Sequence, residues 1–169
     1  MKYGKNLAAP RDSNLFEGER ILVRRIVGKT LISAYTNNDY VTSQLLQIVK
    51  PYNPTLTKFI LGIINSKVMS FYFRKKFNRQ DKTFPEIRIY ELASLPIKII
   101  NNSNNRLQNE IIKYVDQLLL INQEKLLTKL ETNIAQIERK VDYCENRINE
   151  IVYALYELTS EEIKIVEGK

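Results

Sequence analysis

Between Leu127 and Leu158, apolar residues recur at alternating intervals of three and four positions without a break. This is the spacing of an a/d seam on an α-helix, and it is sustained for more than four heptads. Such a seam limits the possible folds, because another helix of this chain, a second copy or another domain has to cover it. The seam positions are Leu127, Leu130, Ile134, Ile137, Val141, Cys144, Ile148, Ile151, Leu155 and Leu158.

A second apolar pattern precedes this seam. Residues Leu107, Ile111, Tyr114, Leu118 and Ile121 follow the same rhythm, but their phase is two residues off. No straight seam serves both patterns, so we expect a break between about Asn122 and Thr128 and an antiparallel helical hairpin. A continuous helix with two partners is the alternative. The run Thr159–Glu162 fits a capping box, which predicts a final short helix.

The first hundred residues favour short strands and helices. The β-branched runs Arg20–Val27 and Thr30–Thr36 flank Gly28-Lys29, which predicts a β-hairpin with glycine first in a two-residue turn. Asn37-Asn38-Asp39 is expected to be a loop. Further strands are expected at Tyr40–Lys50, Glu86–Tyr90 and Lys98–Ile100.

Two helices are expected between those strands. Thr55 or Thr57 is a candidate N-cap for a helix ending near Asn65, and Ser66 is a natural N-cap for a second helix ending near Phe77. The fold class is therefore α+β, with a small, mostly antiparallel sheet followed by a helical hairpin or coiled coil. Asn101–Asn105 is the expected linker between a domain at 1–104 and a helical spacer at 105–169.

Charge is segregated between these two parts. Residues 1–104 hold 17 Lys/Arg against 7 Asp/Glu, a net charge of +10, whereas residues 105–169 hold 9 against 12, a net charge of −3. The sum is the +7 of the whole chain. An excess of this kind indicates that the first part meets a polyanion and that the second part is a scaffold.

The composition excludes many catalytic sites. The chain has no histidine, so it has no Ser-His-Asp triad, no Cys-His pair and no His-containing metal site. Its single cysteine cannot form an internal disulfide. No nucleotide-binding or nuclease-type motif is present. We therefore expect no catalysis, no metal site and no cofactor in this chain itself, no membrane span, and a cytoplasmic location.

The densest set of candidate binding residues lies in Phe71–Phe84, where cations alternate with aromatic and amide side chains. Cations attract phosphates, and Asn, Arg and Gln make bidentate contacts with purine edges. The alternative is a solvated helix end with phenylalanines in the core. The candidates for DNA contact here are Lys75, Lys76, Asn78, Arg79, Gln80 and Lys82.

A second set follows the expected hairpin. Consecutive residues of a strand face opposite sides, so at most one of Arg24 and Arg25 need face a ligand. A polar strand face with an Asn-rich turn explains this set equally well. Its members are Arg24, Arg25, Lys29, Asn37, Asn38 and Tyr40.

Four segments of the chain resemble a known family. The segments Arg20–Ile26, Leu61–Phe73, Phe84–Ile97 and Ile148–Glu167 are similar, in the same order, to the C-terminal specificity domain of TaqI-like adenine methyltransferases and fused type II restriction–modification enzymes. One difference is Glu157, where the family usually has glycine. Glycine would end the helix in a left-handed cap, so Glu157 predicts that the helix continues a little further.

The resemblance implies a division of labour. A catalytic domain outside these residues would bind S-adenosylmethionine, flip an adenine out of the duplex and methylate it, with Mg²⁺ needed if a nuclease is fused. This chain would read double-stranded DNA and contact the methyltransferase domain. The family transfers no individual base contact, because the contacting residues vary with the target.

Two other hypotheses remain open. The chain is also compatible with one half of a separate specificity subunit of a multisubunit restriction system, in which antiparallel helices hold two such domains apart. It is also compatible with a structural protein that forms a homodimer through the heptad helix and binds an acidic partner with its basic part.

Overall fold

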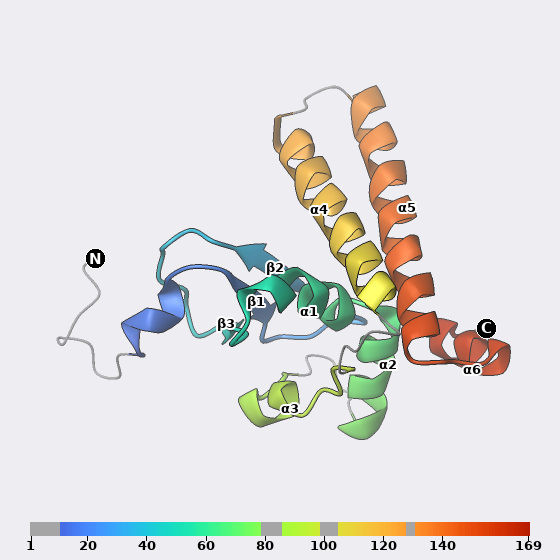
Figure 1. The fold of residues 1–169 in the computed structure, drawn as a ribbon, viewed down its shortest axis with the longest axis horizontal. Coiled ribbons are helices and arrows are strands. Elements are labelled where there is room, and N and C mark those ends of the chain that lie inside the picture. The colour runs from blue at the N-terminus through green and yellow to red at the C-terminus, as the bar shows by residue number, and fades with distance from the viewer. Residues whose placement is uncertain (1–10, 79–85, 99–104, 128–130) are drawn as a thin grey trace.

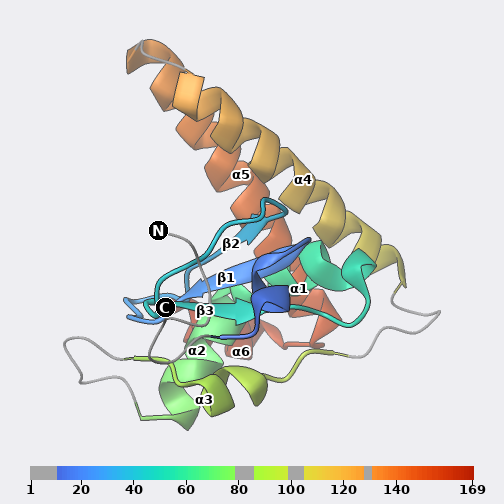
Figure 2. The same cartoon turned by 90° about the vertical axis from the view of Figure 1, so that its left-hand side faces the viewer.

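The computed structural model describes residues 11–78, 86–98, 105–127 and 131–169. Within these residues, a small sheet and short helices form one body, from which two long helices project side by side (Figure 1, Figure 2). The expected α+β class with a helical hairpin is confirmed. The elements are η1 (Ser13–Phe16), β1 (Arg20–Arg24), β2 (Ser33–Thr36), β3 (Leu46–Val49), η2 (Pro54–Leu56), α1 (Thr57–Ile64), α2 (Lys67–Lys76), α3 (Ile89–Ala93), α4 (Asn105–Leu127), α5 (Glu131–Leu155) and α6 (Ser160–Glu167).

The three strands form an antiparallel sheet in the order β2-β1-β3. The expected pairing of the first two strands is confirmed, but the two-residue turn is wrong. Arg20 lies opposite Thr36 and Val23 opposite Ser33, a register one residue away from the one that such a turn would impose. Gly28 also lacks the positive φ of that turn. The physical reason is that Val27 and Leu31 leave the strands to enter the core.

Two expected strands are shorter than predicted or absent. Only Leu46–Val49 of the expected strand at 40–50 is extended, because the preceding chain folds around the side chain of Arg20. The expected strand at 86–90 is wrong, since Glu86 makes a single bridge to Ile26 and α3 begins at Ile89. One helical turn there buries Leu92 and leaves Ile89 exposed. The strand expected at 98–100 lies mostly outside the described residues.

The helices α1 and α2 meet at Asn65 and Ser66. The Ser66 hydroxyl caps α2 by accepting from the Met69 N–H at 3.2 Å, as expected. The first cap differs from the prediction, because Asn53 accepts from the Thr55 N–H and starts η2, which leads into α1. Asn65 binds the edge strand β2, where its Oδ1 accepts from the Ser33 N–H at 2.8 Å and its Nδ2 donates to the Ser33 carbonyl at 3.0 Å.

The helices α4 and α5 form the expected hairpin, and the continuous-helix alternative is wrong. The seam of α5 packs within the chain: Ile137, Cys144, Ile148, Ile151 and Leu155 are buried, and Ile134, Val141 and Leu158 are partly buried. Leu127 was wrongly placed in this seam, since it ends α4 and is exposed, and Leu130 lies outside the described residues.

One hydrophobic core joins the sheet, α1, α2 and the base of the hairpin. It includes Phe59 and Phe73 from the first part of the chain and Ile111, Ile148 and Val152 from the second. The close approach of α1 to α4 depends on Gly62, because a Cβ atom there would lie 2.5 Å from Ile111 Cγ2. The projecting hairpin is therefore anchored in the same core that supports the sheet.

The end of α5 corrects one prediction and the start of α6 confirms another. Glu157 adopts the left-handed conformation (φ 59°), so the helix does not continue past it. The Leu158 N–H bonds to the Tyr153 carbonyl at 3.0 Å and the Glu157 N–H to the Ala154 carbonyl at 3.1 Å, which is a Schellman cap. These bonds hold a non-glycine residue in the glycine conformation. The capping box of Thr159 and Glu162 then begins α6.

Candidate nucleic-acid interface

The last turn of α2 carries three cations, Arg74, Lys75 and Lys76. Positive charge at this end of a helix is stabilised by the helix dipole. Arg74 and Lys75 face a hollow of about 390 Å³ that α2 shares with the connection between β1 and β2 and with α6. Lys29 and Lys67 also line it, and we call these four cations the cationic hollow.

The charge of the cationic hollow is only partly neutralised. Lys67 Nζ lies 3.2 Å from a carboxylate oxygen of Glu167 in α6. Lys29 and Lys75 have no carboxylate partner among the described residues. Lys75 Nζ instead lies 5.8 Å from the centre of the Phe71 ring. Two exposed ammonium groups are therefore available to an anionic ligand.

Phe73 of α2 lies in the core, as the alternative interpretation of this segment predicted. Phe73 is fully buried, and its ring lies 5.5 Å from that of Phe77. Lys76 Nζ is 2.7 Å from the Tyr72 hydroxyl, so this candidate is partly occupied on its own helix. Asn78 has a φ of 50° just after α2, the conformation of a left-handed helix cap. The candidates Arg79, Gln80 and Lys82 lie outside the described residues.

The two arginines that end the first strand differ. Arg24 is exposed, whereas Arg25 is paired with Glu86 at 3.0 Å. Because the partner of Arg25 is 61 residues away, this pairing could not be predicted from the sequence. Of the two, Arg24 is the one left for an external ligand, in line with the expectation from strand alternation.

The loop Asn37–Tyr40 is organised by Arg20, which the sequence analysis did not single out. The guanidinium of Arg20 is buried and donates to the carbonyls of Gly18 (2.8 Å), Asn38 (2.6 Å) and Tyr40 (3.2 Å). It also lies 5.2 Å from the centre of the Tyr40 ring. With the backbone fixed in this way, the side chains of Asn37, Asn38 and Tyr40 remain exposed.

The structure separates the second candidate set into two places. Lys29 lies in the connection between β1 and β2, whereas the loop 37–40 leaves β2 at its opposite end. Lys29 joins the α2 cations Lys67, Arg74 and Lys75. Of these, Lys67 and Arg74 were not among the candidates named from the sequence. Only the fold reveals this grouping, because Lys29 is distant from α2 in the sequence.

The described residues contain no group of three or more carboxylate or cysteine side chains placed to hold a metal. Among these residues, no helix is long and apolar enough to cross a membrane.

A comparison with protein families identifies the first part of the chain. The model of the TaqI-like C-terminal specificity domain matches residues 1–97, more than half of the 169 residues. The chain belongs to this family. The TaqI-like region contains the whole sheet, α1 to α3 and all four cations of the cationic hollow. The expected family resemblance is thereby confirmed, and it places the cationic hollow in a TaqI-like C-terminal specificity domain.

A protein of Methanocaldococcus jannaschii extends the similarity beyond the TaqI-like region. That protein is named as a candidate type II restriction enzyme and methyltransferase, and it is 32% identical over 149 residues. The alignment spans 85% of this chain but only 12% of the relative. The similarity therefore reaches into the helical hairpin, while most of the relative has no counterpart in these residues.

Proposed function

We propose that this TaqI-like domain recognises a specific sequence of double-stranded DNA for a restriction–modification adenine methyltransferase. The observation that carries the proposal is the cationic hollow, where Lys29 and Lys75 are exposed without a carboxylate partner among the described residues. Exposed ammonium groups on one surface attract the DNA backbone and fix the position of the protein on the duplex.

Base recognition is assigned to other residues of the same domain. Asn37 and Asn38 lie in a loop whose backbone Arg20 holds in place, and an Asn side chain can bind an adenine edge through two hydrogen bonds. Arg79 and Gln80 have suitable chemistry as well. We propose that the cationic hollow supplies affinity and that these amide and guanidinium groups supply sequence preference.

Catalysis is assigned to the part of the enzyme outside these residues. That part would bind S-adenosylmethionine, accept the flipped adenine and, where a nuclease is fused, bind Mg²⁺. The contribution of this chain is to hold the duplex in register with the methyltransferase domain. In this proposal neither cofactor is bound by the chain itself.

The helical hairpin fits a separate specificity subunit better than a parallel homodimer. The described seam positions of α5 are buried or partly buried against their own chain, which argues against their use as the a/d surface of a parallel homodimer. An antiparallel pair of helices is, however, what a separate specificity subunit needs to hold two recognition domains apart. A coding sequence with a second basic domain after this one, and no methyltransferase motifs before it, would favour that alternative.

The test is a titration of the chain into a labelled random-sequence duplex at several salt concentrations. Specificity domains that contact phosphates should bind with an affinity whose logarithm falls with log salt by about 0.9 per phosphate contact. Selection of bound duplexes from a random pool then identifies the target. Binding that is independent of salt, or selection that enriches no sequence, would contradict the proposal.

A further inference from the structure

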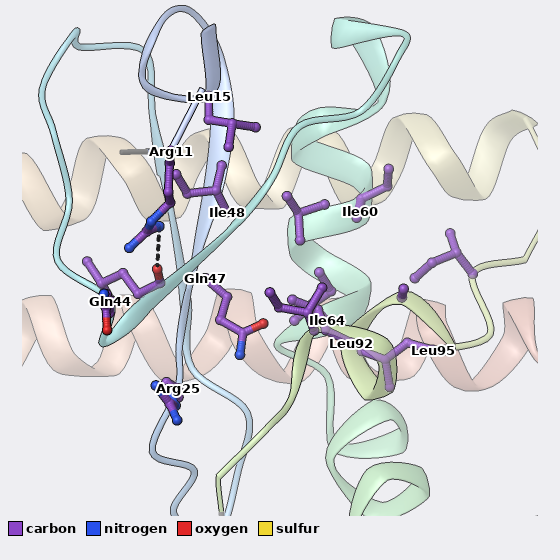
Figure 3. Close-up of a pocket in the computed structure, with 15 residues that line it drawn as sticks. Arg11, Leu15, Arg25, Gln44, Gln47, Ile48, Ile60, Ile64, Leu92 and Leu95 are labelled. Atoms are coloured by element: carbon purple, nitrogen blue, oxygen red, sulfur yellow. Dashed lines mark hydrogen bonds between the residues drawn. The ribbon is translucent and has the colours of Figure 1, made fainter. Parts of the chain in front are cut away.

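A second surface of the domain is apolar. A groove of about 930 Å³ lies beside β3, between the sheet and the helices α1 and α3 (Figure 3). Its walls include Ile60 and Ile64 of α1 and Leu92 and Leu95. All four residues of β3 line it, although successive side chains point to opposite faces of a strand. The groove therefore follows the outer edge of β3.

The backbone along this edge is open at Ile48. The Arg25 N–H donates to the Leu45 carbonyl, so every second residue of β3 bonds to β1 and Ile48 points its N–H and C=O away from the sheet. Neither group of Ile48 has a partner among the described residues. Leu46 also points outward, but its N–H donates to the Ser43 carbonyl at 3.2 Å and its carbonyl accepts a long contact of 3.5 Å from the Arg11 guanidinium, so this residue is partly occupied.

One side-chain atom beside the groove, Gln47 Oε1, has no hydrogen-bond partner among the described residues. Gln47 donates through its Nε2 to the Ile87 carbonyl at 2.5 Å. Its Oε1 is shielded from solvent and has no hydrogen-bond donor among the described residues. The Gln47 side chain lines the groove (Figure 3), and its bond to the Ile87 carbonyl holds it in place there.

The rim of the groove is unusually apolar for an exposed surface. Ile89 of α3 lines it and is 77% exposed, and Leu45, next to β3, is 59% exposed. Large exposed aliphatic side chains beside an open strand edge are typical of an interaction surface. Arg25, one of the two cations that line the groove, is paired with Glu86, and most of the lining residues are apolar, so the site does not suit nucleic acid.

We propose that this groove binds an extended peptide segment of the methyltransferase part of the enzyme, added as a fourth strand beside β3. The inference rests on the proposed function. Such a segment would pair with the N–H and C=O of Ile48 and place alternate apolar side chains against α1 and α3. Such a segment could come from the rest of the enzyme, because 88% of the M. jannaschii relative lies outside the aligned region (100% less the 12% aligned).

Hydrogen exchange of the Ile48 amide tests the inference. Its rate is measured in this chain alone and in the polypeptide or complex that carries the methyltransferase part. We expect exchange at least about tenfold slower in the larger assembly, because the added strand accepts from this N–H. The Tyr35 N–H is the matched control, since it points outward from the opposite edge of the sheet and should keep its rate.

Substitutions in the larger assembly sharpen the result. Ile89→Glu should restore fast exchange at Ile48, whereas Leu120→Glu, at a 65% exposed position of α4, should not. Equal Ile48 rates in the two samples, or protection that Ile89→Glu leaves intact, would overturn the inference. So would protection of Ile48 in the isolated chain by duplex DNA alone, since the occupant would then be nucleic acid. Failure of the proposed function would be seen separately, as loss of salt-dependent DNA binding with Ile48 still protected.

Discussion

The side-chain oxygen of Asn149 lies 2.8 Å from the backbone nitrogen of Lys67, whose N–H donates to it at the first turn of α2. Asn149 also donates to the Glu145 carbonyl of its own helix at 2.9 Å, so its amide is held in one orientation. The hairpin helix α5 therefore fixes the start of the helix whose last turn carries the cations that we propose bind DNA. The helical part of the chain is a positioning element for the cationic hollow.

Removing this tie should lower stability. Asn149→Ala leaves the Lys67 N–H without its acceptor in a half-buried place, and we expect a loss of about 1–2 kcal/mol in the free energy of unfolding. Urea denaturation measures it. Asn146→Ala, one turn earlier at an exposed position, is the control and should change stability by less than about 0.5 kcal/mol. Equal effects of the two substitutions would mean that the hydrogen bond contributes nothing.

Gly62 is the second point at which the hairpin meets the rest of the fold. In Gly62→Ala the new methyl group would lie 2.5 Å from Ile111 Cγ2 and 3.3 Å from Val115 Cγ2, so α1 and α4 must separate. Overpacking of this kind costs about 1–3 kcal/mol, against about 1 kcal/mol gained in helix propensity. We expect a net loss of about 1 kcal/mol, measured by the urea midpoint.

The control for Gly62 is another glycine. Gly28 has open space around its Cα and no positive φ, so Gly28→Ala should be neutral or stabilise by up to about 1 kcal/mol. A second check is Gly62→Ala combined with Ile111→Ala, which removes the clashing methyl. If the double variant loses the full sum of the two single effects, the proposed close contact is not the cause.

Periodicity predicted the elements of this fold that are long enough to show it. The helices from Asn105 to Leu155 were expected because their apolar residues repeat for several turns, and the change of phase correctly indicated a hairpin. The strand expected at 86–90 failed because a five-residue run of alternating residues fits one helical turn equally well. At this segment the helix is favoured because it buries Leu92 in the core.

The candidate site was predictable only in part. Lys75 and Lys76 were expected from local composition, and the structure does place them on one helix end. The pairing of Arg25 with Glu86 and the role of Arg20 could not be expected, because each depends on residues brought together by folding. A buried arginine bound to three carbonyls leaves no mark in the sequence beyond its position in an apolar strand.

Glu157 offers a stabilising substitution. It occupies the left-handed conformation that costs an L-residue about 1–2 kcal/mol and that glycine adopts freely. Its exposed ion pair with Lys98 at 2.9 Å contributes little. Since glycine also loses more entropy on folding, we expect Glu157→Gly to raise the free energy of unfolding by about 0.5–1 kcal/mol. Glu157→Ala keeps the backbone strain, so a similar gain from alanine would refute this explanation.

The cationic hollow predicts a specific change in DNA binding. Lys29→Ala and Lys75→Ala should each weaken binding to all duplexes about equally and reduce the salt slope by about 1, if each contacts a phosphate. Lys125→Ala, in the hairpin and paired with Glu138 at 3.3 Å, is the control. Filter binding at several salt concentrations measures the slope. Unchanged slopes for both hollow variants would remove this surface from the interface.

Acid should loosen α6 from α2 in a defined pH window. Lys169 and Lys67 lower the pKa of Glu167 from 4.5 to about 2, so its carboxylate is charged in the folded state at pH values where it would be protonated in the unfolded chain. A depressed pKa contributes stability above the unfolded value, and the contribution is lost as the pH falls from about 4.5 to about 2. Other carboxylates titrate in this range too, so the measured quantity is the difference in stability between the wild type and Glu167→Gln. That difference should be constant above about pH 6 and shrink steadily toward about pH 2.5. A difference that stays constant down to about pH 2.5 would show that the pairing of Glu167 with Lys169 and Lys67 does not stabilise the fold.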